Sequence, residues 1–248
     1  MIGGVYLINF LGGSSGAFLT SLVCQIVDKP IDDQDIIFGS NGDSHDLSDL
    51  HTGNSSIQGG QYDMTDIPQY IVKRPKDPNR PLVMLDHCIP VYDDLYSIFP
   101  ECKNIVITVP KSMYIRLCGN MFFKNTISGY PGNIKFWQEQ LRLLPYLNNI
   151  ENPIDVPLDV AQKYITDYAK GFKTGDFYSP EFITDEKYKK HVCRINFYAL
   201  IHNPDIVLDQ LSNITEKPIL PEHINFYTRY LEKQQEMVSR NMPWLDDK

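Results

Sequence analysis

Near its start the chain reads Val5-Tyr-Leu-Ile-Asn-Phe10, a short apolar run, and then Leu11-Gly-Gly-Ser-Ser-Gly16, a glycine-rich turn. The apolar run is rich in strand-forming residues and predicts a buried strand that ends in the turn. After the turn, Phe18, Leu22 and Ile26 recur at helical spacing. A strand, a glycine turn and a helix in this order predict the βα unit of an α/β fold.

Working outward from this unit, three further apolar runs have the length of buried strands. They are Leu82–His87, Asn104–Val109 and His191–Asn196. A helical pattern follows each of the first three predicted strands. Strands that alternate with helices imply a parallel sheet covered on both faces. The predicted fold class is therefore α/β, with a central parallel sheet flanked by helices and with helical insertions.

The remaining helices are predicted from apolar residues at helical spacing. Their stripes are Tyr114, Leu117 and Met121; Ile134, Trp137, Leu141 and Leu144; Val160, Tyr164 and Tyr168; Val207, Leu211 and Ile214; and Ile224, Tyr227 and Leu231. Asn203 is the expected N-cap of the fourth of these helices, with Pro204 at its first position, and Pro221 is expected to open the last helix. Residues 39–66 lack periodicity and are rich in Gly, Ser, Asp and Asn, so we expect a long loop or lid there.

The composition is that of an ordinary globular chain: 248 residues, of which 42% are hydrophobic and 22% charged. No repeat or low-complexity linker divides it, so we expect a single domain over residues 1–248. The five cysteines are scattered, which argues for a reducing compartment and against a structural zinc site. The apolar runs fall short of the roughly 20 residues of a membrane span, and no signal peptide is recognisable, so a cytoplasmic protein without a membrane partner is predicted.

The formal net charge of −8 disfavours general nucleic-acid binding, which needs a basic surface. The charge is uneven, however. Nine aspartates lie within residues 28–66, namely Asp28, Asp32, Asp33, Asp35, Asp43, Asp46, Asp49, Asp63 and Asp66. Between Lys103 and Arg142, basic residues instead outnumber acidic residues, of which Glu139 is the only one. An acidic protein with this distribution can still hold a local site for an anion.

The glycine turn is the first candidate for that site. A turn between a strand and a helix directs backbone N–H groups and the positive end of the helix dipole at one spot, which suits a phosphate or sulfate. Ser14 and Ser15 would add hydroxyl groups. Gly16 is followed by Ala17 and Phe18 rather than by the lysine and hydroxyl residue of nucleotide hydrolases, which argues against an ATPase or an ordinary kinase. The alternative interpretation is a tight turn that needs glycine for its backbone alone.

Several segments in one order resemble the sulfotransferase family. They are Phe10–Leu19 (FLGGSSGAFL) at the place of the phosphosulfate-binding loop, Leu82–Val91 (LVMLDHCIPV) at the strand that carries the catalytic histidine, Asn104–Phe123 (NIVITVPKSMYIRLCGNMFF) at the strand and helix that hold the 3′-phosphate, and Arg194–Ile214 (RINFYALIHNPDIVLDQLSNI) at a late strand and helix. The family has Lys or Arg where this chain has Ser14. The family's 3′-phosphate arginine falls on Pro110, beside Lys111, and its serine falls on Cys118.

The resemblance implies a P-loop enzyme that transfers a sulfuryl group from 3′-phosphoadenosine 5′-phosphosulfate, its co-substrate, to a hydroxyl or amine of a small molecule or glycan. It implies His87 as the catalytic base and no metal. The implied nucleotide-binding residues are Gly12, Gly13, Ser14, Ser15, Gly16, Ala17, Phe18, Lys111 and Cys118.

The individual residues also admit plainer interpretations. His87 has a pKa near 6.5 that suits a base, but a histidine bonded in a turn after a strand would look the same. Lys111 and Arg116 are candidate phosphate ligands or solvated helix residues, and for Arg116 we expect solvation. His45 and His51 are expected to be solvated loop residues rather than metal ligands. The alternative functions are a degenerate relative that binds an anion or glycan without catalysis, and another P-loop transferase or kinase.

Overall fold

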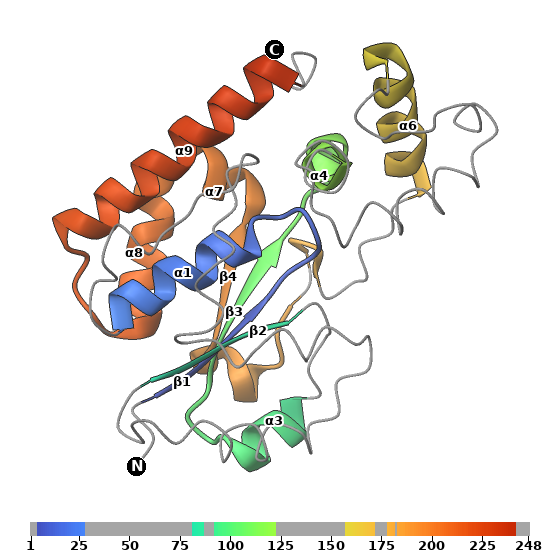
Figure 1. The fold of residues 1–248 in the computed structure, drawn as a ribbon. Helices are drawn as coiled ribbons and strands as arrows, with labels where there is room; N and C mark the ends of the chain where they lie inside the picture. Colours follow the sequence, from blue (N-terminus) through green and yellow to red (C-terminus); the bar gives the residue numbers. More distant parts are fainter. Residues whose placement is uncertain are drawn as a thin grey trace.

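The structure is a computed structural model, and it describes residues 4–27, 81–86, 92–122, 157–171, 178–181 and 183–241. In this part of the chain a sheet lies at the centre, with helices against both faces and beyond one end (Figure 1). The α/β class with a parallel sheet flanked by helices is thereby confirmed.

The sheet is built from the predicted apolar runs. Its strands are β1 Val5–Asn9, β2 Leu82–Asp86, β3 Lys103–Thr108 and β4 Val192–Asn196. They lie in the order β2-β1-β3-β4, and each neighbouring pair is parallel. Each predicted strand forms with ends within one residue of the prediction, because strands buried on both faces are nearly continuous apolar runs.

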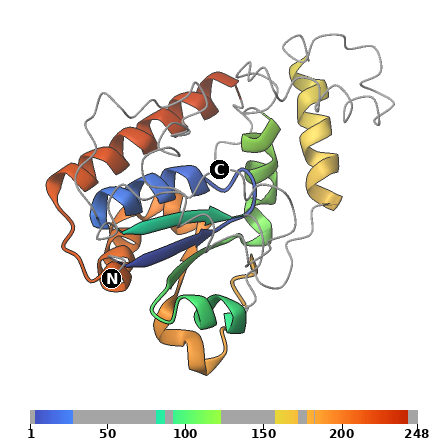
Figure 2. The same cartoon turned by 60° about the horizontal axis from the view of Figure 1, so that its bottom comes forward.

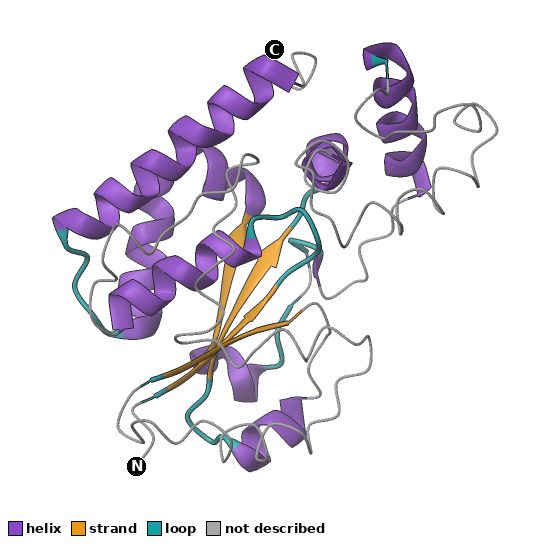
Figure 3. Cartoon of the chain, in the orientation of Figure 1, coloured by secondary structure: helices purple, strands orange, loops and turns teal. Residues whose placement is uncertain are grey.

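The described helices occupy both faces of the sheet and the space beyond its end (Figure 3). They are α1 Gly16–Val27, α3 Tyr92–Ile98, α4 Tyr114–Phe122, α6 Leu158–Gly171, α7 Phe197–His202, α8 Pro204–Thr215 and α9 Pro221–Asn241, with the short 3-10 helices η4 Lys111–Met113 and η9 Glu186–His191. Helix α8 begins at Pro204 with Asn203 as its N-cap, as predicted, although the Asn203 side chain makes no capping hydrogen bond. Helix α7 was not predicted.

The two faces of the sheet carry separate cores. Tyr6 and Ile8 of β1 pack in the larger core, together with α1, α7, α8 and α9. Val5 and Leu7 point to the other face and pack with residues of β2 and α3. Alternate residues of one strand therefore serve opposite layers, and α1 and α3 lie on opposite sides of the sheet (Figure 2).

The buried stripe of α9 differs from the predicted one. Ile224 was placed on the apolar face, but its side chain is 48% exposed. Tyr227 is buried as predicted, and Leu231 packs partly buried against the core. The other buried positions of the helix are His223, Phe226, Tyr230 and Gln234. The buried face of α9 is turned away from Ile224 because Phe226 and Tyr230, together with the predicted Tyr227, pack on the ring of Phe18 on α1.

Some predicted features lie outside the described residues. They are His87, the loop 39–66 and the helical stripe from Ile134 to Leu144. Among the helices that the structure does describe, none combines the length and the apolar character that crossing a membrane would require.

The start of α9 supplies a prediction about pH. His223 is buried, and its Nδ1 accepts a hydrogen bond of 3.1 Å from the backbone N–H of Leu220, which fixes the first turn of the helix. Burial lowers the pKa of His223, while Glu222 and a hydrogen bond to the backbone of Gln25 partly oppose the shift. Below about pH 6.5 the unfolded chain therefore binds more protons than the folded chain, and stability falls as the pH falls.

We expect the urea midpoint of the wild type to decrease between pH 7.5 and 5.5, and we expect this decrease to be smaller in His223→Gln. His191, whose pKa burial also lowers, contributes in the same direction and accounts for part of the remaining slope. Equal decreases in the wild type and His223→Gln would show that His223 does not titrate with folding.

Candidate functional site

The C-terminal ends of the parallel strands meet at one edge of the sheet, near α4 and α7 (Figure 1). In open parallel sheets, ligands bind at this edge beside the strand where the order reverses. Here β2 follows β1 in the chain and lies on one side of it, whereas β3 lies on its other side. The reversal therefore falls at β1. The loop that follows β1 and the turn that follows β3 lie at this switch point.

The loop after β1 has an unusual backbone. Gly13 has a φ of 83° and Ser15 a φ of 64°, both in the left-handed region. Glycine adopts this region without strain, which explains Gly13, whereas serine does so at a cost of roughly 1 kcal/mol or more. The loop then enters α1, whose first turn contains no acidic residue. The backbone N–H groups of Gly16, Ala17 and Phe18 form no hydrogen bond with any residue that the structure describes.

Gly16 is required for a different reason. A Cβ atom built at this position would lie 2.0 to 2.2 Å from three ring carbons of Phe10. No real contact of this kind is so short, and the atoms involved are at the base of a buried ring that has no room to move away. The loop can therefore pass over Phe10 only because residue 16 has no side chain.

Ser14 stabilises the loop from inside. Its backbone N–H and its hydroxyl both donate to the carbonyl oxygen of Leu11, at 3.0 and 2.6 Å. The residue is fully buried. Because its one hydroxyl proton is engaged, the Ser14 side chain contributes to the shape of the loop and has no proton left to donate elsewhere.

Ser15 is the last residue before α1, and its carbonyl oxygen accepts the first helical hydrogen bond, from the N–H of Leu19 at 3.1 Å. The hydroxyl of Tyr230, on α9, donates a short hydrogen bond to Ser15 Oγ. Both residues are buried. The contact joins the loop to a helix 215 residues further along the chain.

The side chain of Phe18 belongs to the core. Its ring is fully buried and is stacked on Tyr230, with ring centroids 3.6 Å apart and planes at 6°. The hydroxyls of Thr20 and Ser21 donate to the carbonyls of Gly16 and Ala17, at 2.8 and 2.9 Å. The ring contact joins α1 to α9, and the two hydroxyl contacts lie within the first turns of α1.

The turn after β3 carries Lys111. It is exposed and opens the short helix η4, whose N-cap is Pro110. Its charge helps to lower the pKa of Glu181, after the larger effects of hydrogen bonds from Ser179 and from the backbone N–H of Glu181. Lys111 therefore places an exposed positive charge, with Glu181 in its neighbourhood, in the turn that follows β3.

Two side chains of α4 are more buried than their sequence suggested. Cys118 is buried, and burial raises the pKa of its thiol to about 12, so the group is neutral at physiological pH. Arg116 was predicted to be solvated, and this prediction is wrong, because only 8% of the residue is exposed. Helix α6 packs against α4.

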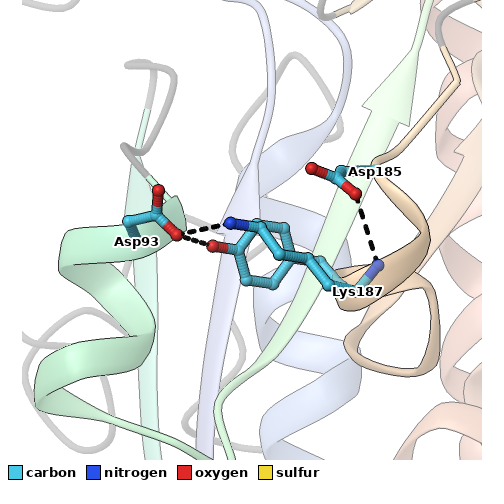
Figure 4. Close-up of polar contacts among 4 residues, drawn as sticks. Asp93, Asp185 and Lys187 are labelled. Atoms are coloured by element: carbon cyan, nitrogen blue, oxygen red, sulfur yellow. Dashed lines mark hydrogen bonds and ion pairs between the residues drawn. The ribbon is translucent and has the colours of Figure 1, made fainter.

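Helix α3, on the opposite face, is tied to η9. Asp93 accepts a hydrogen bond of 2.7 Å from Lys187 Nζ and a short one from the hydroxyl of Tyr188 (Figure 4). These hydrogen bonds, with that from Lys187 as the largest contribution, hold the pKa of Asp93 below its usual value. The backbone N–H of Lys187 in turn donates to Asp185. The ion pair between Asp93 and Lys187 fixes the start of α3, the helix that follows β2 in the chain.

The chain was also compared with known proteins. No protein-family model matches the chain, and no curated protein matches it. One similar solved structure is a sulfotransferase domain. It is described as the "Sulfotransferase Domain from the Curacin Biosynthetic Pathway"; the match covers 92% of this chain and 78% of that one, at 14% identity and a TM-score of 0.37.

Of the predicted site residues, Gly12 to Phe18 and Lys111 all follow strands at the switch point, and Cys118 lies in the helix after Lys111. His87 is outside the described residues, although β2, which it follows, ends at the same edge beside β1. No group of three or more His, Cys, Asp or Glu side chains suited to a metal occurs in the described ranges.

Two polar residues inside the fold, Tyr230 on α9 and Arg194 on β4, were not predicted as site residues. Tyr230 was missed because it stands in the apolar stripe of α9, where a tyrosine looks like core. Arg194 is half-buried in β4, opposite Val106 of β3, and its Nε donates to Thr184 Oγ1 at 3.4 Å. An arginine inside an otherwise apolar strand was the signal that would have singled it out.

Proposed function

We propose that the chain is a sulfuryl transferase that uses 3′-phosphoadenosine 5′-phosphosulfate and modifies a hydroxyl group of a small molecule or glycan. The observation that carries this proposal is the left-handed loop at the switch point of the sheet, which leads into the N-terminus of α1. Such a loop presents unpaired N–H groups and the positive end of a helix dipole to an anion. Because the loop itself has no basic side chain, the backbone is the main source of its attraction for anions.

The residues of the chain fit such a nucleotide at two points. The loop from Gly12 to Phe18 would hold the phosphosulfate end through the backbone N–H groups of Gly16, Ala17 and Phe18, since the N–H of Ser14 already donates to Leu11. Lys111, after the neighbouring strand, would attract the 3′-phosphate as a point charge. When bound, the nucleotide would supply the sulfuryl group. An imidazole nitrogen of His87, after β2, would take the proton of the acceptor hydroxyl, since an unperturbed histidine pKa near 6.5 suits a base at neutral pH.

The proposal predicts that adenosine 3′,5′-bisphosphate, the desulfated donor, stabilises the folded chain. A ligand that binds only the native state adds about 2.7 kcal/mol of stability at about 100 times its Kd. We expect a clear rise of the Tm at millimolar ligand, measured by differential scanning fluorimetry, and a smaller rise in Lys111→Glu. Adenosine, which has neither phosphate, is the control and should leave the Tm unchanged.

Transfer is tested separately with radiolabelled donor and a panel of hydroxyl acceptors. His87→Asn should keep the stabilisation by the bisphosphate and lose transfer. No stabilisation of the wild type at millimolar ligand would overturn the proposal. Stabilisation without transfer to any acceptor would instead support a relative that binds an anion without catalysis.

A further inference from the structure

Ser15 occupies a conformation that suits glycine better. Its φ of 64° lies in the left-handed region, although the chain uses glycine at three nearby positions of the same loop, Gly12, Gly13 and Gly16. A non-glycine residue persists in such a conformation only when its surroundings impose it. The serine hydroxyl therefore has a role that offsets the backbone strain.

The position of Ser15 makes its hydroxyl contact unusual. Ser15 is the residue that precedes α1, and a serine at an N-cap normally turns its oxygen toward the N–H of the second or third helical residue. Those residues are Ala17 and Phe18, and Ser15 Oγ accepts from neither of them. It accepts from the hydroxyl of Tyr230 instead. The serine hydroxyl, which would normally bond to the N–H groups of the helix N-terminus, is thereby turned away from them.

Tyr230 is well suited to impose this arrangement. It is fully buried, and its ring is stacked on Phe18. Phe18 also contacts Phe226 and Tyr227, so the ring of Tyr230 cannot shift without disturbing α9 as a whole. The rigid ring fixes the donor hydroxyl, and the donor hydroxyl fixes Ser15.

We propose that Tyr230 is a positioning residue for the anion loop: it holds Ser15 in a left-handed, non-capping conformation and so keeps the N–H groups of Ala17 and Phe18 available to the 5′-phosphate group of a nucleotide. The inference rests on the proposed function of this loop. When Tyr230 loses its hydroxyl, Ser15 is released, relaxes toward the extended conformation of an N-cap and competes with the ligand for the same N–H groups.

The test compares Tyr230→Phe with Tyr227→Phe by isothermal titration calorimetry. Tyr227 is the matched control, because it lies on the same helix, is equally buried and donates its hydroxyl to the carbonyl of Leu200 at 2.7 Å, away from the loop. We expect Tyr230→Phe to weaken the binding of adenosine 3′,5′-bisphosphate about fivefold, the equivalent of one hydrogen bond. Tyr227→Phe should bind within about twofold of the wild type.

Two further measurements separate positioning from a general loss of structure. Binding of 3′-AMP, which has no 5′-phosphate, should be unaffected by Tyr230→Phe. In a Ser15→Gly background, which keeps the left-handed backbone and has no hydroxyl to compete, Tyr230→Phe should have no effect on the bisphosphate. If the wild type binds adenosine 3′,5′-bisphosphate and Tyr230→Phe binds it equally well, the inference is wrong and the proposed function stands. The same holds if Tyr230→Phe weakens the binding of 3′-AMP as much as that of the bisphosphate. Absence of binding to any 5′-phosphate nucleotide by the wild type would overturn the proposed function and the inference with it.

Discussion

Gly16→Ala is expected to destabilise the chain by about 3 kcal/mol, although alanine is the better helix former. Helix propensity alone favours alanine by about 1 kcal/mol. The added methyl, however, would lie 2.0 Å from Cγ of Phe10. The ring would have to leave its buried site, which sacrifices about 2 to 3 kcal/mol of burial and adds strain of similar size. Packing therefore outweighs propensity. A decrease in the urea midpoint of Gly16→Ala would show that the clash with Phe10 dominates, and an increase would show that helix propensity does.

A double-mutant cycle with Phe10→Ala identifies the source of the effect. The methyl of Gly16→Ala fits once the ring of Phe10 is gone, so the double variant should be about as stable as Phe10→Ala alone. If Gly16→Ala lowers the free energy of unfolding equally with and without the ring, Phe10 is not the obstacle.

Loss of the loop shape should also abolish the stabilisation by adenosine 3′,5′-bisphosphate in any fraction of Gly16→Ala that remains folded.

The strands of this fold could be predicted closely because their signal is local. Each is a short apolar run with a clear end, and burial in a parallel sheet demands that composition. The position of the loop followed from the same signal, since a glycine turn after β1 had to lie at the C-terminal edge of the sheet. Helix α7 was missed because six residues directly after a strand give too short a stretch for helical periodicity to be visible.

The details of the site depended on contacts that no local pattern contains. Phe18 was expected both in the apolar stripe of the first helix and among the nucleotide-binding residues, and the stacking of Tyr230 on its ring shows that the side chain belongs to the core. Arg116 was expected in solvent, because the stripe of α4 shows which side meets the sheet and not what covers the other sides. The hydrogen bond from Tyr230 to Ser15 joins residues at opposite ends of the chain, so neither residue indicates the other.

Phe18→Ala is expected to be as costly as the change at Gly16, and for the opposite reason. The ring fills the space between α1 and α9. It is stacked on Tyr230, and its centroid lies 5.5 Å from that of Phe226 and 5.1 Å from that of Tyr227. Truncating a fully buried phenylalanine leaves a cavity and costs about 3 to 5 kcal/mol. That is a large share of the 5 to 15 kcal/mol that usually separates the folded from the unfolded state. The expected measurement is a large decrease in the urea midpoint.

Two variants show whether the packing between α1 and α9 causes this loss. Tyr198→Ala removes an aromatic ring that is 46% exposed on α7, and it should change stability by less than about 0.5 kcal/mol. Phe18→Leu keeps most of the volume and should cost clearly less than Phe18→Ala. Because Tyr230 rests on Phe18, Phe18→Leu should nevertheless weaken the binding of adenosine 3′,5′-bisphosphate in the same direction as Tyr230→Phe. If Phe18→Leu were destabilised but bound the nucleotide as tightly as the wild type, Tyr230 would not depend on Phe18 for its position.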